Sequence, residues 1–170
     1  SVLSSLLLLS ACSSDTTTTP AAAPAQPAAK PPAAPEKTPS PPVNADMDAA
    51  ITVLMAKSEQ ADENISIQHV LIAFKGAPRM TKVTRSKDEA KTLAQKVYAE
   101  AIGGSDFDAL VKQYTDDSPP GIYAVTKPAR KDWVKGFGDV GFRLKVGEIG
   151  VAPWDATASP FGWHIIKRLK

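Results

Sequence analysis

The sequence predicts an α+β fold, in which a small, mostly antiparallel four-stranded sheet is flanked by helices and preceded by a disordered Pro/Ala-rich tether. Nine of the fifteen prolines lie between Pro20 and Pro42, interleaved with alanine, and such a segment favours extended polyproline II and offers no core. From residue 64 onward, short β-branched runs alternate with apolar residues at helical spacing. Roughly 105 residues of this kind suffice for one compact domain.

The first residues are expected to hold an export signal. Four leucines at residues 6–9 run into Ser10-Ala11-Cys12, and this pattern resembles a bacterial lipobox, which is cleaved before its cysteine. Residues 1–11 would then be part of a lipoprotein signal peptide, and residues 12–45 the lipidated Cys12 and its linker. Acyl chains on Cys12 would anchor the chain to a membrane.

The residues after the cysteine bear on where such an anchor is placed. Ser13 and Ser14, rather than Asp, follow the cysteine. By resemblance to sorted lipoproteins, we therefore expect the anchor to lie in the outer membrane, with the protein facing the periplasm. The alternative interpretation of Cys12 is an unpaired thiol in a disordered tail. A lone cysteine forms no internal disulfide, so it gives no further information on the redox compartment.

The first half of the folded part predicts two strongly capped helices. Residues 46–63 are expected to hold an amphipathic helix with Asn44 or Asp46 as N-cap, and the sequence leaves open whether it packs on the domain. A strand follows at residues 65–74. Two capping patterns then predict a long helix that ends at a pair of glycines and a shorter helix after it: Ser86 with Glu89, and Ser105 with Asp108.

The second half predicts three strands and one small helix. Apolar runs at residues 122–125, 149–154 and 163–169 predict the strands, and residues 134–144 predict the helix. The complete order after the first helix is strand, helix, helix, strand, helix, strand, strand.

Formal charge excludes one class of partner. From residue 64 onward there are 17 Lys and Arg against 11 Asp and Glu, and residues 46–63 carry five acidic residues and one lysine. This balance lacks the clustered basic density of a nucleic-acid surface, so no nucleic-acid partner is expected.

The only two histidines, His69 and His164, are the strongest indication of function. Each lies inside a short apolar run that predicts a strand. Imidazole titrates near neutral pH and both donates and accepts a hydrogen bond when it is uncharged. If the two strands are neighbours, the imidazoles share one pocket. A histidine in an apolar strand can also be purely structural.

Four motifs in one order extend this observation over residues 65–170. They are Gln68-His69-Val70-Leu71, the run from Ser105-Asp106-Phe107 to Tyr114-Thr115-Asp116-Asp117, the run from Phe137 to Ile149, and Phe161-Gly162-Trp163-His164-Ile165-Ile166. Together they resemble the parvulin-type (rotamase) peptidyl-prolyl cis/trans isomerases, in a lipoprotein form, with residues 64–170 as the isomerase domain. The resemblance implies a monomeric foldase that rotates X-Pro bonds of exported or envelope proteins without a cofactor or metal.

The resemblance also assigns roles to individual residues. His69, His164 and Asp117 match the hydrogen-bonded catalytic network of the family, which Thr115 is expected to join. A second set would form the apolar wall that binds the proline ring: Trp133, Phe137, Phe142 and Tyr123. Asp117 could instead cap the chain before Pro119, and Phe142 could be core.

Departures from the family pattern leave two other interpretations open. Gly121-Ile122-Tyr123 replaces a glycine-rich stretch, and Trp133 replaces Met or Leu, which would suit a non-catalytic peptide-binding or chaperone module. His69, His164 and Asp117 could also form a facial metal site, although no short-range ligand spacing accompanies them. Basic residues in the loop after the first strand are interpreted as solvated charge: Lys75, Arg79, Lys82 and Arg85.

Overall fold

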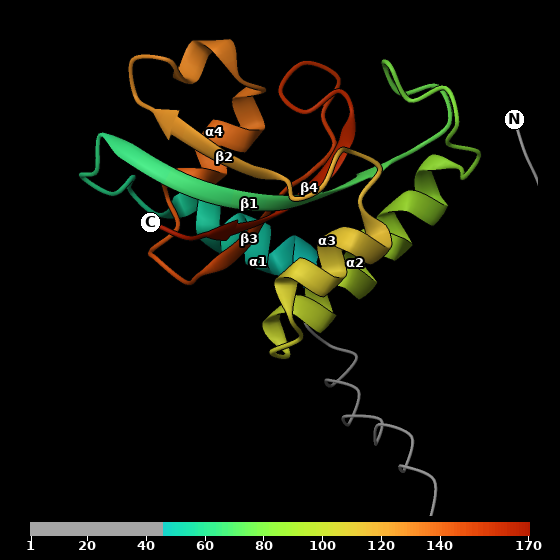
Figure 1. Ribbon diagram of the computed structural model, residues 1–170, viewed down its shortest axis with the longest axis horizontal. Coiled ribbons are helices and arrows are strands. Elements are labelled where there is room, and N and C mark those ends of the chain that lie inside the picture. Colours follow the sequence, from blue (N-terminus) through green and yellow to red (C-terminus); the bar gives the residue numbers. More distant parts are fainter. Residues whose placement is uncertain (1–45) are drawn as a thin grey trace, which may run out of the picture. The chain divides into compact units, whose positions relative to one another are not determined.

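The computed structural model describes residues 46–170, and its centre is one four-stranded sheet (Figure 1). The strands are β1 (Asn64–Ala73), β2 (Ile122–Thr126), β3 (Ile149–Ala152) and β4 (Gly162–Arg168), in the order β2-β1-β4-β3. Every neighbouring pair is antiparallel. The predicted fold class is confirmed, and the first and last strands are the central neighbours. Cys12, the signal and the tether lie outside the described residues.

Helices cover both faces of this sheet (Figure 1). They are α1 (Met47–Ala56), α2 (Lys87–Ile102), α3 (Phe107–Tyr114) and α4 (Lys135–Gly141). One face carries Val70 and Ile165 and packs against α2 and α3, while the other carries Ile67 and Ile166 and packs against α4. Because side chains alternate along a strand, the two histidines both lie on the face that α4 covers.

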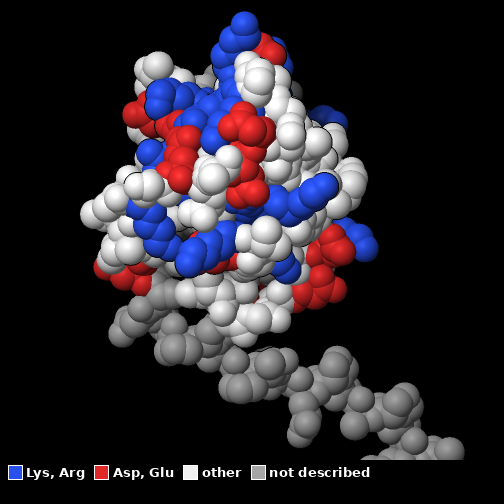
Figure 2. All heavy atoms as spheres, turned by 90° about the vertical axis from the view of Figure 1, so that its left-hand side faces the viewer, with Lys and Arg blue, Asp and Glu red and all other residues white. Residues whose placement is uncertain are grey.

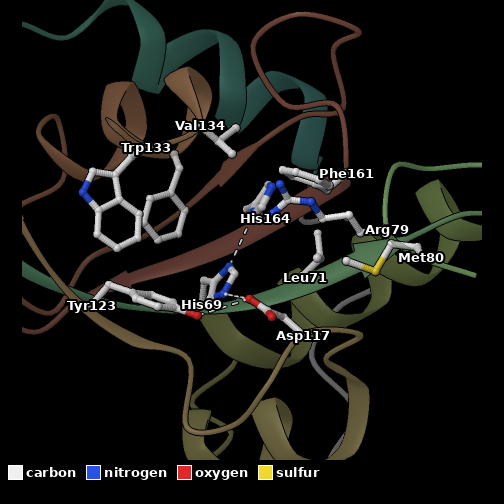
Figure 3. A pocket seen from close by; sticks show the side chains of 11 residues that line it. His69, Leu71, Arg79, Met80, Asp117, Tyr123, Trp133, Val134, Phe161 and His164 are labelled. Atoms are coloured by element: carbon white, nitrogen blue, oxygen red, sulfur yellow. Dashed lines mark hydrogen bonds and ion pairs between the residues drawn. The ribbon is translucent and has the colours of Figure 1, made fainter. Parts of the chain in front are cut away.

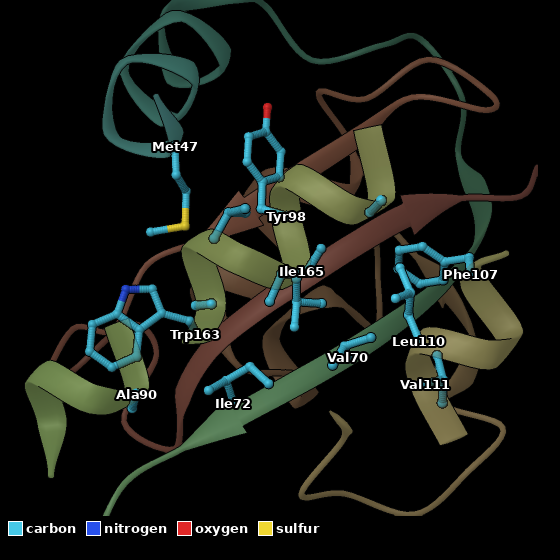
Figure 4. Close-up of a cluster of buried hydrophobic side chains, with 14 residues drawn as sticks. Met47, Val70, Ile72, Ala90, Tyr98, Phe107, Leu110, Val111, Trp163 and Ile165 are labelled. Atoms are coloured by element: carbon cyan, nitrogen blue, oxygen red, sulfur yellow. The ribbon is translucent and has the colours of Figure 1, made fainter. Parts of the chain in front are cut away.

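The larger core lies between the sheet and helices α2 and α3 (Figure 4). Its strand residues are β-branched or aromatic, which suits a pleated surface, and alanines on α2 let that helix approach closely. The buried members of this core that Figure 4 labels are Met47, Val70, Ile72, Ala90, Tyr98, Phe107, Leu110, Val111, Trp163 and Ile165. This core supports one face of the sheet, so the opposite face is available for a functional site.

Helix α1 docks on the domain, which answers a question that the sequence left open. Asp46 caps it by accepting hydrogen bonds from the backbone N–H groups of Asp48 and Ala49, and Met47 is fully buried against the larger core. The prediction of a helix through residues 46–63 was too long, because the helix ends at Ala56. Residues 57–63 have no apolar stripe to bury and form an irregular linker into β1.

The caps of the next two helices are local features that the sequence largely predicted. Ser86 and Glu89 form the expected capping box at the start of α2. The N-cap of α3 is Asp106 rather than the predicted Ser105, since the carboxylate of Asp106 accepts from the backbone N–H of Asp108 at 2.9 Å. A carboxylate near a helix N-terminus also favours the helix dipole.

The second half differs from the prediction at element boundaries and in one additional turn. Helix α4 is shorter than the predicted 134–144, and a 3₁₀ turn that sequence spacing did not indicate, η1 (Arg130–Asp132), precedes it. Strand β3 ends at Ala152 rather than Trp154, because Pro153 has no N–H to donate to a neighbouring strand.

Candidate active site

The two imidazoles lie side by side at the centre of the sheet. In the register of β1 and β4, His69 pairs with Ile166 and His164 pairs with Leu71, so the two histidines are diagonal neighbours. Their Nδ1 atoms lie 3.1 Å apart and their rings are nearly parallel, at 12° with centroids 5.3 Å apart. This confirms the prediction that the imidazoles meet, and both are buried.

A carboxylate completes a chain of hydrogen bonds (Figure 3). His69 Nε2 lies 3.2 Å from Asp117 Oδ2, and the Tyr123 hydroxyl donates to the same oxygen at 3.2 Å. The backbone N–H of Ser118 donates to the other oxygen at 2.8 Å. The hydrogen bond from His69 is the largest of the effects that lower the pKa of Asp117 to about 2, so the carboxylate is charged at neutral pH.

These contacts determine where the protons lie. An ionised Asp117 only accepts hydrogen bonds, so the proton of this contact lies on Nε2 of His69. In neutral His69 the Nδ1 atom then carries a lone pair, which accepts a hydrogen bond from the Nδ1–H group of His164. The Nε2 atom of His164 is then a buried acceptor without a partner in the described part of the chain. Burial, and then the neighbouring His69, lower the pKa of His164 to about 3, so its ring is neutral.

The loop after α3 places Asp117 beside His69. β2 pairs with β1 only up to Gln68, so residues 71–73 of β1 have a free edge there. Asp116 occupies that edge, since its N–H donates to the backbone O of Leu71 and its carboxylate accepts from the N–H of Ala73. Thr115 was predicted to join the network. Its hydroxyl instead accepts from the backbone N–H groups of Leu71 and Asp117, and it has no hydrogen bond to either imidazole.

Gly121 lets the start of β2 approach His69 closely. Its backbone O accepts from the N–H of His69 at 2.9 Å, and its φ of 64° lies in the left-handed region. A Cβ atom at this position would lie 2.7 Å from the backbone O of His69. Glycine is therefore required both by conformation and by space.

Three aromatic rings form a wall beside the imidazoles (Figure 3). Trp133 stacks on Phe137 at 5.8 Å and 19°, and Tyr123 meets Trp133 edge-on at 5.2 Å. Phe137 is edge-on to both imidazoles, with centroid distances of 5.1 Å to His69 and 5.7 Å to His164. Such edge-to-face contacts are favourable and fix the relative positions of the rings. We name Tyr123, Trp133 and Phe137 the aromatic wall.

The wall and the imidazoles enclose one pocket of about 310 Å³. Six of the predicted site residues line it: His69, Asp117, Tyr123, Trp133, Phe137 and His164. Five lining residues were not predicted: Leu71, Arg79, Met80, Val134 and Phe161. The sequence contained a signal for two of these, because Leu71 and Phe161 belong to the motifs that hold His69 and His164.

The structure places Phe142 in the core, the alternative that the sequence left open, and not in the proline-binding wall that the resemblance implied. Its side chain is fully buried in the core between α4 and the sheet, and it does not line the pocket. Phe137 and Phe142 are five positions apart, so they point from different sides of the segment. Phe137 faces the imidazoles, while Phe142 lies at the C-cap of α4. The guanidinium carbon of Arg130 lies 5.4 Å from the centroid of the Phe142 ring.

The basic loop after β1 contributes one charge to the pocket. Arg79 lines its mouth, and its φ of 63° makes it the one non-glycine residue with positive φ among residues 46–170. No carboxylate of the described residues lies within ion-pair distance of Arg79, whereas Arg85 is paired with Asp116. Non-glycine residues with positive φ are uncommon and concentrate at functional sites.

Two further features are absent from residues 46–170. No helix there is long and apolar enough to cross a membrane. The same residues hold no cluster of three or more His, Cys, Asp or Glu side chains arranged to bind a metal ion.

Comparison with known proteins identifies the class to which this fold and site belong. A family model described as a PPIC-type PPIASE domain matches residues 50–170. The chain therefore belongs to the PPIC-type, or parvulin, peptidyl-prolyl isomerase family, as the motifs predicted. It is 29% identical over 116 residues to Chaperone SurA of Pseudomonas fluorescens, and this match covers 65% of the chain but only 24% of SurA.

Two solved structures share the fold. The solution structure of TbPIN1 matches with a TM-score of 0.54 at 23% identity, over 64% of this chain and 99% of TbPIN1. The peptidyl-prolyl isomerase ESS1 from Candida albicans matches with a TM-score of 0.55 at 19% identity, over 73% of each chain. At these identities the likeness supports the four-stranded fold alone.

Proposed function

We propose that this protein is a peptidyl-prolyl cis/trans isomerase that acts on X-Pro bonds of exported or envelope polypeptides. The reaction is a rotation about the C–N bond of the amide, opposed by a resonance barrier of roughly 20 kcal/mol. No covalent bond forms or breaks. A catalyst must therefore bind the twisted amide more tightly than the planar one.

The aromatic wall supplies the grip on the substrate. A proline ring is apolar and rigid, and the partly exposed rings of Trp133 and Tyr123 offer it apolar surface. The buried ring of Phe137 contacts both of them and holds them in place. Holding that ring while the preceding carbonyl turns limits the motion to the reacting bond. A dry pocket also disfavours the planar amide, whose resonance separates charge and is stabilised by water.

The network on the floor of the pocket supplies fixed electrostatics. Asp117 orients His69, and His69 in turn holds His164 in one tautomer. The imidazoles therefore do not need to reorganise when the amide twists beside them, which is the condition under which polar groups catalyse best. We assign Thr115 a positioning role, since its hydroxyl holds the backbone of Asp117.

We further propose that the protein works outside the cytoplasm, anchored by lipid on Cys12 to a bacterial membrane. Support comes from the leucine run that ends in Ser10-Ala11-Cys12 and from the proline-rich segment that follows it. An uncatalysed X-Pro bond isomerises in tens of seconds, so proteins that fold after export benefit from such a catalyst. Mass spectrometry of Cys12 in membrane fractions tests the anchor, and an unmodified thiol would contradict it.

The observation that carries the function is the contact of Phe137 with both imidazoles, because it joins the apolar grip and the polar network in one pocket. The test is a protease-coupled assay on a short X-Pro peptide with wild type, His69→Ala and Trp133→Ala. We expect His69→Ala to lower kcat/KM by about a hundredfold, the low end of the effect of a single acid–base or electrostatic group.

A matched control is available in Trp154, which lies outside the pocket and contacts Lys87 and Phe74. Trp133→Ala is expected to raise KM, and Trp154→Ala is expected to leave KM unchanged. Peptide binding without turnover in wild type, with no further change in His69→Ala, would instead indicate a non-catalytic peptide-binding module.

A further inference from the structure

Residues 57–63, the linker between α1 and β1, contact the segment that carries the aromatic wall. Both oxygens of Glu59 lie close to Nη1 of Arg130, at 2.8 and 2.9 Å, and Oε1 also lies 3.2 Å from Nη1 of Arg143. The next residue, Gln60, donates its backbone N–H to the backbone O of Phe142 at 2.7 Å. The linker is therefore fixed along the end of α4.

Arg130 connects this linker to α4. The other side of its guanidinium is paired with Asp139, and its aliphatic stem lies against Gly138, where an added Cβ would be 3.0 Å from Arg130 Cγ. Burial alone would raise the pKa of Asp139, but hydrogen bonds from Lys135 and Arg130 outweigh it and hold the pKa below its usual range. Asp139 is therefore charged at neutral pH and pairs with Arg130.

The same residue determines where the wall begins. The backbone N–H of Trp133 donates to the backbone O of Arg130 at 3.1 Å, so the indole follows directly from the 3₁₀ turn that Arg130 opens. Trp133 then stacks on Phe137, which belongs to α4. The two stacked rings of the wall thus come from the two pieces of chain that Arg130 joins.

Charges on this face are paired in networks. Figure 2 shows acidic and basic side chains interleaved on the face where residues 57–63 lie. Glu59, Arg130 and Asp139 are each less than a third exposed, whereas Glu63 of the same linker is 67% exposed and pairs with Lys127 at 3.2 Å. Networked, partly buried pairs couple more strongly than exposed ones.

We propose that Glu59 is a positioning residue of the proline pocket, acting through Arg130 to hold Trp133 against Phe137. The linker ahead of the domain is then a working part of the site, although it contributes no lining residue. This inference rests on the proposed function for its substrate class. Without the carboxylate of Glu59, the indole of Trp133 loses its fixed position and proline peptides bind less tightly.

The test compares Glu59→Gln with the matched control Glu63→Gln in the full chain. For a short X-Pro peptide, Glu59→Gln is expected to raise KM and Kd by about threefold to tenfold with kcat within about twofold, a coupling of the usual size for a residue one step removed from the site. Glu63→Gln is expected to leave KM and Kd at the wild-type value. Glu59→Asp, which keeps the charge, should restore part of the affinity.

A spectroscopic readout separates positioning from general destabilisation. The indole N–H resonance of Trp133, assigned by its loss in Trp133→Phe, is expected to shift or broaden in Glu59→Gln and to stay in place in Glu63→Gln. Wild-type KM and an unmoved indole resonance in Glu59→Gln would overturn the inference, and so would equal effects of the two substitutions.

The same measurements distinguish this inference from the proposed function. If the wild-type chain binds the peptide without turnover, the isomerase proposal fails, and Kd still reports whether Glu59 acts on the pocket. If turnover is present and Glu59→Gln binds as wild type does, only the positioning inference fails. Combining Glu59→Gln with Arg130→Gln should change Kd by less than the product of the single effects, since both act through one contact.

Discussion

Replacing His164 with glutamine is expected to remove most of the pH dependence of folding stability between pH 7.5 and pH 5.0. His164 is buried against His69, and its Nε2 atom has no partner among the described residues. A proton on this ring would have to be accommodated without water. Glutamine keeps a polar group of similar size that does not titrate.

The magnitude follows from the depressed pKa. Below pH 6.5 the unfolded chain binds a proton on His164, whereas the folded chain does not bind it until the pH nears its folded value of about 3. The free energy of unfolding therefore falls by roughly 1.4 kcal/mol per pH unit as the pH drops below 6.5. Between pH 7.5 and 5.0 this amounts to about 2 kcal/mol.

The pH range separates this effect from that of Asp117. The depressed pKa of Asp117, about 2, stabilises the folded state above its unfolded value near 4, and that contribution is lost only as the pH falls from about 4 towards 2. Because more than a third of this side chain is exposed, solvent screening reduces its contribution further. The chosen interval lies above that range.

The assay is urea denaturation of wild type and His164→Gln at both pH values. The difference in unfolding free energy between pH 7.5 and 5.0 is compared within each protein, so any constant cost of the substitution cancels. We expect the difference to shrink by about 2 kcal/mol in the variant. An equal pH difference in the two proteins would refute the reasoning.

Three further substitutions test other parts of the site. Tyr123→Phe keeps the ring of the aromatic wall and removes the donor to Asp117, so kcat should fall about fivefold, the equivalent of one net hydrogen bond, with KM unchanged. Phe142→Ala should cost about 3–5 kcal/mol of unfolding free energy, because it empties a fully buried core position. Gly121→Ala should lower kcat/KM by more than tenfold, since its Cβ would displace His69.

For each of the three substitutions, a different result would contradict the prediction. A rise in KM without loss of kcat in Tyr123→Phe would mean that its hydroxyl contacts substrate and not the network. Urea denaturation that finds Phe142→Ala as stable as wild type would place that ring outside the core. Wild-type kinetics in Gly121→Ala would show that β2 can shift without moving the imidazole.

Much of the fold could be predicted because its signals are local. The capping box at Ser86, the glycine stop after α2 and the apolar, β-branched run of β1 each depend on residues close together in sequence. The meeting of His69 with His164 is a long-range contact, and it was predictable because both lie in apolar runs and belong to an ordered set of motifs. The roles assigned to the individual site residues remain predictions that the proposed experiments test.

The sequence predictions failed where the residue type does not determine which way a side chain points. Phe137 and Phe142 are the same residue type on one short segment, and only the packing of α4 shows that one faces the imidazoles and the other the core. Arg79 and Met80 look like ordinary loop residues until the fold brings them to the pocket. Their direction depends on tertiary structure.

Ionic contacts between distant segments also could not be predicted from the sequence. Glu59 and Arg130 are 71 positions apart, and nothing in the local pattern of either indicates that they meet. The hydroxyl of Tyr123 likewise finds Asp117 only because Gly121 allows β2 to begin against β1. Such contacts depend on the register and on the path of loops, for which a single sequence carries little signal.

The central claim is that the paired imidazoles and the aromatic wall together accelerate rotation about an X-Pro bond. NMR exchange spectroscopy on an X-Pro peptide, with the full chain at a small fraction of the peptide concentration, measures this directly and without a coupling protease. We expect exchange cross-peaks between the cis and trans forms that disappear in a His69→Ala, Trp133→Ala double variant. Cross-peaks that stay absent with wild-type protein, while the peptide resonances report binding, would contradict the claim.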